Sequence, residues 1–308
     1  MINRTIIRIK VLQIVYAYYQ KDSKDLALAE NELLFGMQKS YDLYHYLLLL
    51  IVLLTDTEQK RLDVKKNKLL ATEAERNPNR RLADNRFAEQ LSGNKQLQKF
   101  AHEKGTFWDY ENSHFVRSML NKILQSDIYH DYLESEDTYG SDRDFWTKVF
   151  KNLILKDDEL DEVLEGQSVY WNDDLEVIGA FVLKTIRRFT ADTTAGQDLY
   201  PMFKDADDKD FAIRLLHHSL LEEKENNRRI TEQINNWDIE RLAVMDLYIL
   251  QIALAELRNF PSIPISVTLN EYIDLARYYS TPKSPVFING ILDAIVKELK
   301  NEKLLFKD

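Results

Sequence analysis

Glycine and proline are scarce in this chain, at 14 of 308 residues. These two residues mark tight turns and irregular backbone, so a chain that holds so few of them has little sequence suited to turns. Over most of the length, apolar residues instead recur at the three- and four-residue spacing of amphipathic helices, and no run alternates in the way that indicates a series of strands. We therefore expect an all-α fold.

The carboxy-terminal hundred residues carry the most regular helical pattern. Residues 238–259 are apolar almost all the way round, which predicts a helix enclosed by others at the centre of a bundle. A last helix is expected at 285–302, where Ser284 suits the N-cap. Gly290 lies inside this helix and costs it ~1 kcal/mol relative to alanine, so we expect a neighbouring helix to approach closely there.

Turn signals between the other helices are few, and the stretch that most resembles a linker is 191–201. We therefore expect an amino-terminal helical lobe over residues 1–205 and a carboxy-terminal helical bundle over residues 206–308.

Charge is unevenly distributed along the chain, whose formal net charge is −10. Residues 59–104 hold twelve Lys or Arg and six Asp or Glu, whereas residues 127–176 hold sixteen acidic and four basic side chains. Because the acidity is concentrated in one zone, it does not exclude an anionic partner on another surface. The first helix itself begins with a small cationic patch of Arg4, Arg8 and Lys10.

The residues disfavour most classes of enzyme and cofactor site. The chain has no cysteine, which removes disulfides and thiolate chemistry and is typical of a reducing, cytoplasmic compartment. Its eight glycines lie too far apart for a G-x-G-x-x-G or phosphate loop, and its six histidines form no H-E-x-x-H motif. Acid pairs such as Asp157 and Asp158 are more typical of a solvated helix face than of acid-base catalysis. We expect a binding protein that is not an enzyme, with no catalytic residue, metal, cofactor or small-molecule substrate.

A membrane partner is not expected either. The longest apolar run, residues 47–54, falls well short of the ~20 residues that a bilayer span requires. The first helix lacks the separate charged, apolar and cleavage regions of a signal peptide.

Four blocks of sequence resemble the transcription antitermination factor NusB family. "ALAEL" (253–257) closes the central helix, "NEYIDLAR" (270–277) follows a proline-containing loop, and "VFINGILD" (286–293) stands where the family has F-V-N-G-V-L-D. At the amino terminus, "RIKVLQIVYAYYQ" (8–20) is similar to the R-x-x-A-x-Q-x-L-Y helix of the family. The likeness covers about residues 1–50 and 205–300.

The resemblance implies two packed helical sub-bundles, to which residues 55–205 add a helical insertion without a clear family counterpart. It also implies binding of boxA-type RNA of ribosomal RNA transcripts together with the ribosomal protein NusE, within the RNA polymerase antitermination complex. The RNA-binding residues that it implies are Arg4, Arg8, Lys10, Tyr16, Ser284, Phe287 and Asn289, and the partner-binding residues are Glu240 and Asp246.

These residue types suit the implied roles. Arg and Lys neutralise phosphates, and Tyr and Phe offer faces on which unstacked bases stack. Asp246 stands on a nearly all-apolar helix, where an acidic side chain requires a partner.

Ordinary structural interpretations stay open for several of these residues. Tyr16 and Phe287 could belong to the core, and Arg4 and Arg8 could be plain surface charges. Phosphate contacts could also come from the basic zone of the insertion, namely from Lys65, Lys66, Lys68, Arg80, Arg81 and Arg86.

Two other functions also stay open. One is a helical protein-protein adaptor in ribosomal RNA synthesis or assembly, with weak or no direct RNA binding. The other is a ribosomal RNA methyltransferase that carries a NusB-like domain, and the lack of a glycine-rich cofactor loop disfavours it.

Overall fold

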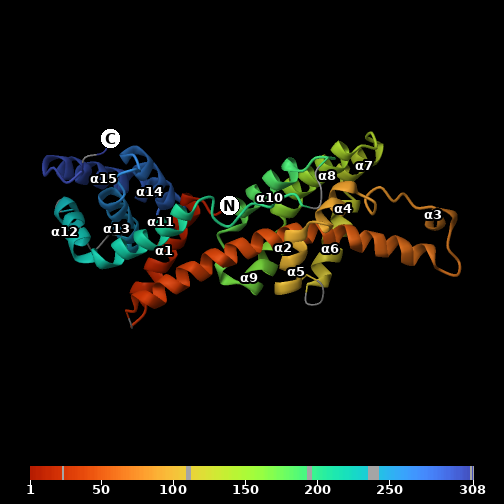
Figure 1. The fold of residues 1–308 in the computed structure, drawn as a ribbon, viewed down its shortest axis with the longest axis horizontal. Helices are drawn as coiled ribbons and strands as arrows, with labels where there is room; N and C mark the ends of the chain where they lie inside the picture. The colour runs from red at the N-terminus through yellow and green to blue at the C-terminus, as the bar shows by residue number, and fades with distance from the viewer. Residues whose placement is uncertain (23, 109–111, 193–195, 235–242, 306, 308) are drawn as a thin grey trace. The chain divides into compact units, whose positions relative to one another are not determined.

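The computed structural model describes the chain except for residues 23, 109–111, 193–195, 235–242, 306 and 308, and consists of helices joined by short connections (Figure 1). The described residues form fifteen α-helices and two short 3-10 helices, without a β-strand. The predicted all-α fold is therefore confirmed.

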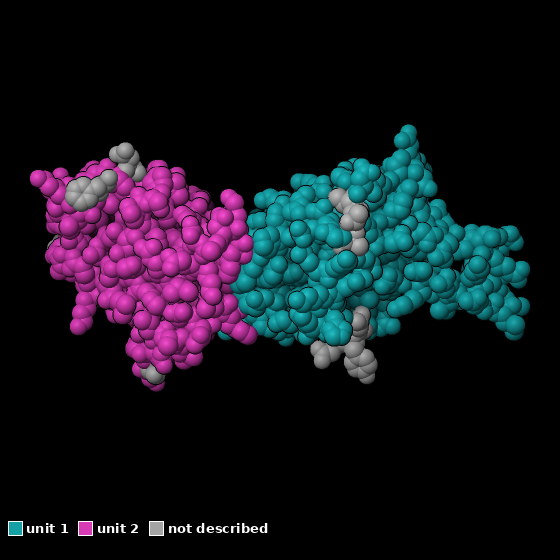
Figure 2. Space-filling model, in the orientation of Figure 1, with its two compact units in different colours: residues 1, 38–202 teal, residues 2–37, 203–308 magenta. Residues whose placement is uncertain are grey.

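The chain forms two compact units, shown in Figure 2. Unit 1 comprises residues 1 and 38–202, and unit 2 comprises residues 2–37 and 203–308. This division differs from the expected boundary at residue 205, because the first helix belongs with the carboxy-terminal helices. The long helix α2 (Leu26–Lys66) contributes residues to both units.

Unit 2 is a helical bundle around one enclosed helix. Its complete helices are α1 (Arg4–Gln20), α11 (Ala206–Leu221), α12 (Glu223–Ile234), α13 (Val244–Asn259), α14 (Ile265–Tyr279) and α15 (Ser284–Asn301). Helix α13 contacts each of the other five, and its residues from Tyr248 to Leu257 are all buried. The described part of the predicted central helix therefore lies at the centre of the bundle, as its all-round apolar sequence indicates.

Local capping explains where several helices begin. Asn3 caps α1, because its side chain accepts a hydrogen bond from the Ile6 amide at 2.9 Å. Ser284 does not cap α15 as expected, since the helix begins at Ser284 itself and the N-cap residue is Lys283. Gly290 is exposed, and no described atom lies within 4 Å of the place where its Cβ would stand. The expected close helix approach at Gly290 is therefore not found among the described residues.

Unit 1 contains the shorter helices. In addition to its part of α2, it holds α3 (Glu73–Arg76), α4 (Arg86–Ser92), α5 (Lys95–Lys104), α6 (Ser113–Leu124), α7 (Asp127–Glu134), α8 (Tyr139–Asn152), α9 (Asp158–Gln167) and α10 (Leu175–Arg188). Asn94 caps α5 and Ser126 caps α7 through their side-chain oxygens. These two caps divide stretches that periodicity alone presents as single helices.

Large aromatic side chains form much of the unit 1 core. Trp108 and Trp146 are fully buried, and the Trp108 indole donates to the Tyr46 carbonyl at 2.8 Å. Gly179 on α10 allows the Leu155 side chain to pack closely, because an added Cβ would lie 2.6 Å from a Leu155 methyl carbon. This contact fixes α10 in unit 1.

Candidate functional site

The first helix is joined to the centre of unit 2 by a buried ion pair. Arg8 donates from Nε to Glu256 Oε2 at 2.7 Å and from Nη2 to Glu256 Oε1 at 2.8 Å, and its Nη1 lies 3.2 Å from Glu271. Thr268 and Tyr272 donate to the same Glu256 carboxylate at 2.8 and 3.0 Å. Burial by itself lowers the pKa of Arg8, but its hydrogen bonds to Glu256 and the nearby carboxylate charges outweigh this effect and raise the pKa. The network connects α1 with α13 and α14.

The three amino-terminal cations have different surroundings. The side chains of Arg8 and Lys10 are each only 2 % exposed, whereas Arg4 keeps 41 % of its side chain exposed. The Arg4 guanidinium lies 4.9 Å from the centre of the Phe211 ring and 3.7 Å from the Asp208 carboxylate. Arg4 is therefore open to an anionic ligand, whereas contact of Arg8 with RNA would require its buried ion pair to break.

Tyrosine side chains gather where the last turns of α1 meet the start of α13. Tyr19 stacks on Tyr248 with ring centres 5.1 Å apart, and Tyr16 meets Tyr248 edge-on at 6.1 Å. Gln251 donates to the Tyr19 hydroxyl at 2.7 Å. Burial raises the pKa of Tyr19, so its hydroxyl stays protonated. Tyr16 remains 43 % exposed, which leaves part of its ring accessible to a base.

Cationic side chains also lie near this tyrosine cluster. The Lys24 ammonium is 5.2 Å from the ring centres of both Tyr18 and Tyr19 and donates to the Tyr18 carbonyl at 2.8 Å. Lys21 is exposed and pairs with Glu32 at 2.7 Å. The sequence analysis did not select these residues, although the run "YAYYQK" followed by Lys24 is a signal for them.

Asp246 has internal hydrogen-bond partners. It is buried and accepts hydrogen bonds from Ser280 Oγ at 2.6 Å and Ser284 Oγ at 2.9 Å. Ser284 also accepts from the Thr281 amide at 3.1 Å. The expected partner of Asp246 is therefore the connection between α14 and α15, which it fixes against α13. Glu240, the other expected partner-binding residue, lies outside the described residues.

The first turns of α15 present a mixed surface. Phe287 is half-buried, Asn289 is exposed, and Lys283 is exposed directly before the helix. Ser284, in contrast, is buried by its hydrogen bonds to the Asp246 cluster.

Helices α1 and α13 run antiparallel, because Arg8 pairs with Glu256 and Tyr19 with Tyr248. The first turns of α13 therefore contact both Tyr16 and, through Asp246, the start of α15. Arg4 precedes Tyr16 by twelve residues, which is about 18 Å along a helix. The structure thus brings Tyr16 and the start of α15 to one end of the bundle, and it places Arg4 toward the other end of α1.

Comparisons with known proteins agree with this arrangement. The NusB family model matches residues 177–297. A transcription antitermination protein NusB from Geotalea daltonii is 36 % identical over 138 residues, which cover 44 % of this chain and 92 % of the relative. The chain belongs to the NusB family. Another such protein, from Salinibacter ruber, is 36 % identical over 107 residues, which cover 35 % of this chain and 67 % of the relative. No solved structure matches the chain.

The NusB family match extends into unit 1, since it begins within α10. Most of unit 1 nevertheless lies outside this match. None of the helices in the described ranges is long and apolar enough to cross a bilayer. In the same ranges, no three His, Asp or Glu side chains are placed to hold a metal ion.

The arginines of the basic zone in unit 1 have internal partners. Arg80 pairs with Asp63 and Asp84, both at 3.1 Å. Arg86 pairs with Asp137 and, at 2.6 Å, with the buried Asp142. These contacts indicate a structural role for both arginines.

Arg81 is also held internally, because it donates to the Leu133 and Ser135 carbonyls and its guanidinium lies 4.3 Å from the centre of the Tyr132 ring. Among the lysines of the zone, Lys68 pairs with Glu75 at 2.8 Å, Lys65 is half-buried and Lys66 is exposed at the end of α2.

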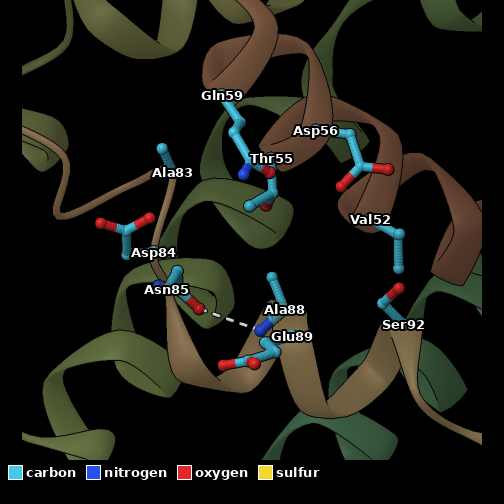
Figure 3. A pocket seen from close by; sticks show the side chains of 10 residues that line it. All are labelled: Val52, Thr55, Asp56, Gln59, Ala83, Asp84, Asn85, Ala88, Glu89 and Ser92. Carbon is cyan, nitrogen blue, oxygen red and sulfur yellow. Dashed lines mark hydrogen bonds between the residues drawn. The ribbon is translucent and has the colours of Figure 1, made fainter. Parts of the chain in front are cut away.

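A cavity of about 300 Å³ lies between α2 and α4 in unit 1 (Figure 3). Its charged lining residues are Asp56, Asp84 and Glu89, and no Lys or Arg lines it. Asn85 at its edge caps α4 by accepting from the Ala88 amide at 3.0 Å. The acidic lining does not suit a phosphate ligand, so the cavity is separate from the candidate RNA surface.

Proposed function

We propose that this NusB-family protein is a transcription antitermination factor that binds boxA-type RNA together with NusE, in the RNA polymerase antitermination complex. It acts by binding and not by catalysis. The antitermination role rests on the curated relatives, which carry that function in their name. The observation that best supports RNA binding is the partly exposed Tyr16, held edge-on against Tyr248 at the end of the bundle where α15 begins.

The proposed RNA surface comprises Tyr16, Lys24, Lys283, Phe287 and Asn289. Tyr16 and Phe287 offer ring surface to unstacked bases, and Asn289 offers both a donor and an acceptor to a base edge. Lys24 and Lys283 neutralise phosphates, so binding weakens as salt rises. Arg4 contributes at a distance, to RNA that extends along α1.

Three of the expected RNA-binding residues then have indirect roles. Arg8 holds α1 against α13 through Glu256, and Lys10 belongs to the buried part of α1. Ser284 orients the first turn of α15 through Asp246. These residues position the surface and do not contact RNA.

The proposed NusE surface lies around the start of α13. Val244, Tyr278 and Val286 are exposed by 54, 74 and 80 %, and each lies two residues from a member of the Asp246, Ser280 and Ser284 cluster. Exposed apolar side chains that surround a fixed point are typical of a protein-binding site. Asp246 supports this surface from beneath, and Glu240 is proposed to act beside it.

A binding experiment with purified NusE tests the proposal. Fluorescence anisotropy with labelled boxA-type RNA and a scrambled RNA of the same composition measures the preference at moderate salt, with and without NusE. The proposal expects a clear preference for boxA that NusE increases. If NusE binds and neither RNA is preferred, the protein is instead a helical adaptor without specific RNA binding.

A further inference from the structure

A second cationic surface lies in unit 1, at the carboxy-terminal end of α10. Lys184, Arg187 and Arg188 are exposed there within five residues of sequence. Among the residues that the structure describes, no carboxylate lies within ion-pair distance of any of the three, whereas Arg80 and Arg86 of the same unit are both paired with aspartates.

Two aromatic rings lie under these cations. The Lys184 ammonium is 4.7 Å from the centre of the Phe181 ring, and the Arg188 guanidinium carbon is 4.8 Å from the centre of the Tyr200 ring. Phe181 and Tyr200 meet edge-on at 5.7 Å. The two rings are half-buried, so they support the cations from beneath and hold them at the surface.

The segment that carries Tyr200 is fixed by its backbone. The Tyr41 hydroxyl donates to the Tyr200 carbonyl at 3.0 Å, and the Tyr200 amide donates to the Tyr44 hydroxyl at 3.3 Å. The Leu199 amide donates to Gln96 at 2.7 Å. Arg188 in turn donates to the carbonyl of Asp198 at 2.5 Å. The surface is therefore preorganised.

We propose that this surface, comprising Phe181, Lys184, Arg187, Arg188 and Tyr200, binds single-stranded RNA outside the boxA element. Lys184 and Arg187 contact phosphates. Arg188 covers Tyr200 with one face of its planar guanidinium, and a base stacks on the other face. The inference rests on the proposed RNA-binding function and adds a second contact in unit 1.

RNA fits this chemistry better than an acidic peptide does. Clustered cations over aromatic rings suit a ligand that alternates phosphates with flat bases, since guanidinium planes and aromatic side chains both stack on unpaired bases. A peptide carboxylate uses the charge but not the flat surface. The positions of the cations at a helix carboxy terminus also favour the helix dipole, which accounts for stability but not for the aromatic support.

The test uses the full chain and two labelled RNAs, a boxA-type RNA and the same RNA extended by a single-stranded uridine tract. The wild-type protein is expected to bind the extended RNA more tightly, with a steeper dependence on salt. The triple variant K184A/R187A/R188A should lose this gain, and its salt slope for the extended RNA should fall by about 2, because each single-strand phosphate contact contributes about 0.7. Its affinity for the short boxA RNA should stay unchanged.

Two further variants separate charge from stacking and from net charge. Arg188→Lys keeps the charge but removes the flat guanidinium, so it should keep the salt slope and lose at least about fivefold in affinity for the extended RNA. The control K60A/K65A/K66A removes three positive charges from α2 and should keep the full gain. Circular dichroism of each variant confirms that the helices remain folded.

The outcomes that overturn the inference are specific. An extension that adds no affinity, a triple variant with the wild-type slope, or a control that loses as much as the triple variant would each refute it. Competition by polyglutamate as strong as that by polyuridine would show an acidic protein partner instead. A failure of the proposed function would show differently, as equal binding of boxA and scrambled RNA while the uridine tract still adds affinity.

Discussion

Arg8 and Glu256 form a two-hydrogen-bond ion pair at 2.7 and 2.8 Å, with both side chains almost completely buried. The pair joins the first helix to the central helix of unit 2, although the two residues are 248 positions apart in the sequence. It gives α1 a fixed register against α13, and this register places Tyr16 beside Tyr248.

Breaking this pair from one side should destabilise unit 2 strongly. Arg8→Met leaves the Glu256 carboxylate buried without its main partner, which costs about 3–5 kcal/mol of the free energy of unfolding. Urea unfolding followed by circular dichroism measures this loss. The double variant Arg8→Met with Glu256→Leu should recover part of it, since no charge is then left unpaired. A loss below about 1 kcal/mol in the single variant would contradict the structural role of Arg8.

Glu225 on α12 should contribute to stability in a pH-dependent way. Its hydrogen bonds to Arg228 and Arg229 lower the pKa of the carboxyl group to about 2, against the opposing effect of burial. A carboxyl group whose pKa is lower in the folded state stabilises the fold above its unfolded pKa, and the contribution is lost as pH falls from about 4.5 toward 2.

Glu225→Gln should therefore lower the free energy of unfolding at pH 7, by no more than about 1 kcal/mol because Glu225 is 38 % exposed. The difference from wild type should shrink toward pH 2 in urea titrations at several pH values. A difference that grows on acidification would be the wrong sign for this account.

Tyr16→Ala should weaken RNA binding more than it weakens the fold. Removing a ring on which a base stacks costs ~1–3 kcal/mol of binding free energy. The side chain is 43 % exposed, so the loss of buried apolar area is small. The control Phe35→Ala removes another half-exposed ring of unit 2 and should leave the boxA affinity unchanged in anisotropy titrations. Equal losses in the two variants would remove Tyr16 from the binding surface.

Cations near the tyrosine cluster should matter more than the first cations of the chain. Lys24→Ala and Lys283→Ala should each reduce the slope of log affinity against log salt by about 0.7 for a boxA-type RNA. Arg4→Ala should change this slope less, because Arg4 lies about 18 Å from Tyr16 along α1. The reverse order would move the RNA surface to the amino-terminal end of α1.

Much of the fold followed from local features of the sequence. The scarcity of glycine and proline predicted helices throughout, and the all-round apolar character of residues 238–259 predicted the central helix whose described part is α13. Helix boundaries were less accurate where a single polar residue ends the pattern, because the caps at Asn94 and Ser126 interrupt apolar spacing that otherwise continues. Gly290 shows another limit, since its exposure depends on neighbours and not on its own helix.

The candidate site was harder to predict, because charge type alone does not distinguish a paired cation from an available one. Arg8 and Arg4 have the same chemistry, but only Arg8 meets a carboxylate in the core. The expectation that Asp246 requires a partner was confirmed by Ser280 and Ser284. Lys24 was not selected because its position beside Tyr18 and Tyr19 depends on how the chain turns after α1.

The most direct test of the central claim is photochemical cross-linking of a boxA-type RNA that carries 4-thiouridine to the full-length protein, followed by mass spectrometry of the linked peptides. The account predicts cross-links in the last turns of α1, which contain Tyr16, and in the first turns of α15, which contain Phe287. Cross-links confined to unit 1, with none in these two segments, would contradict it.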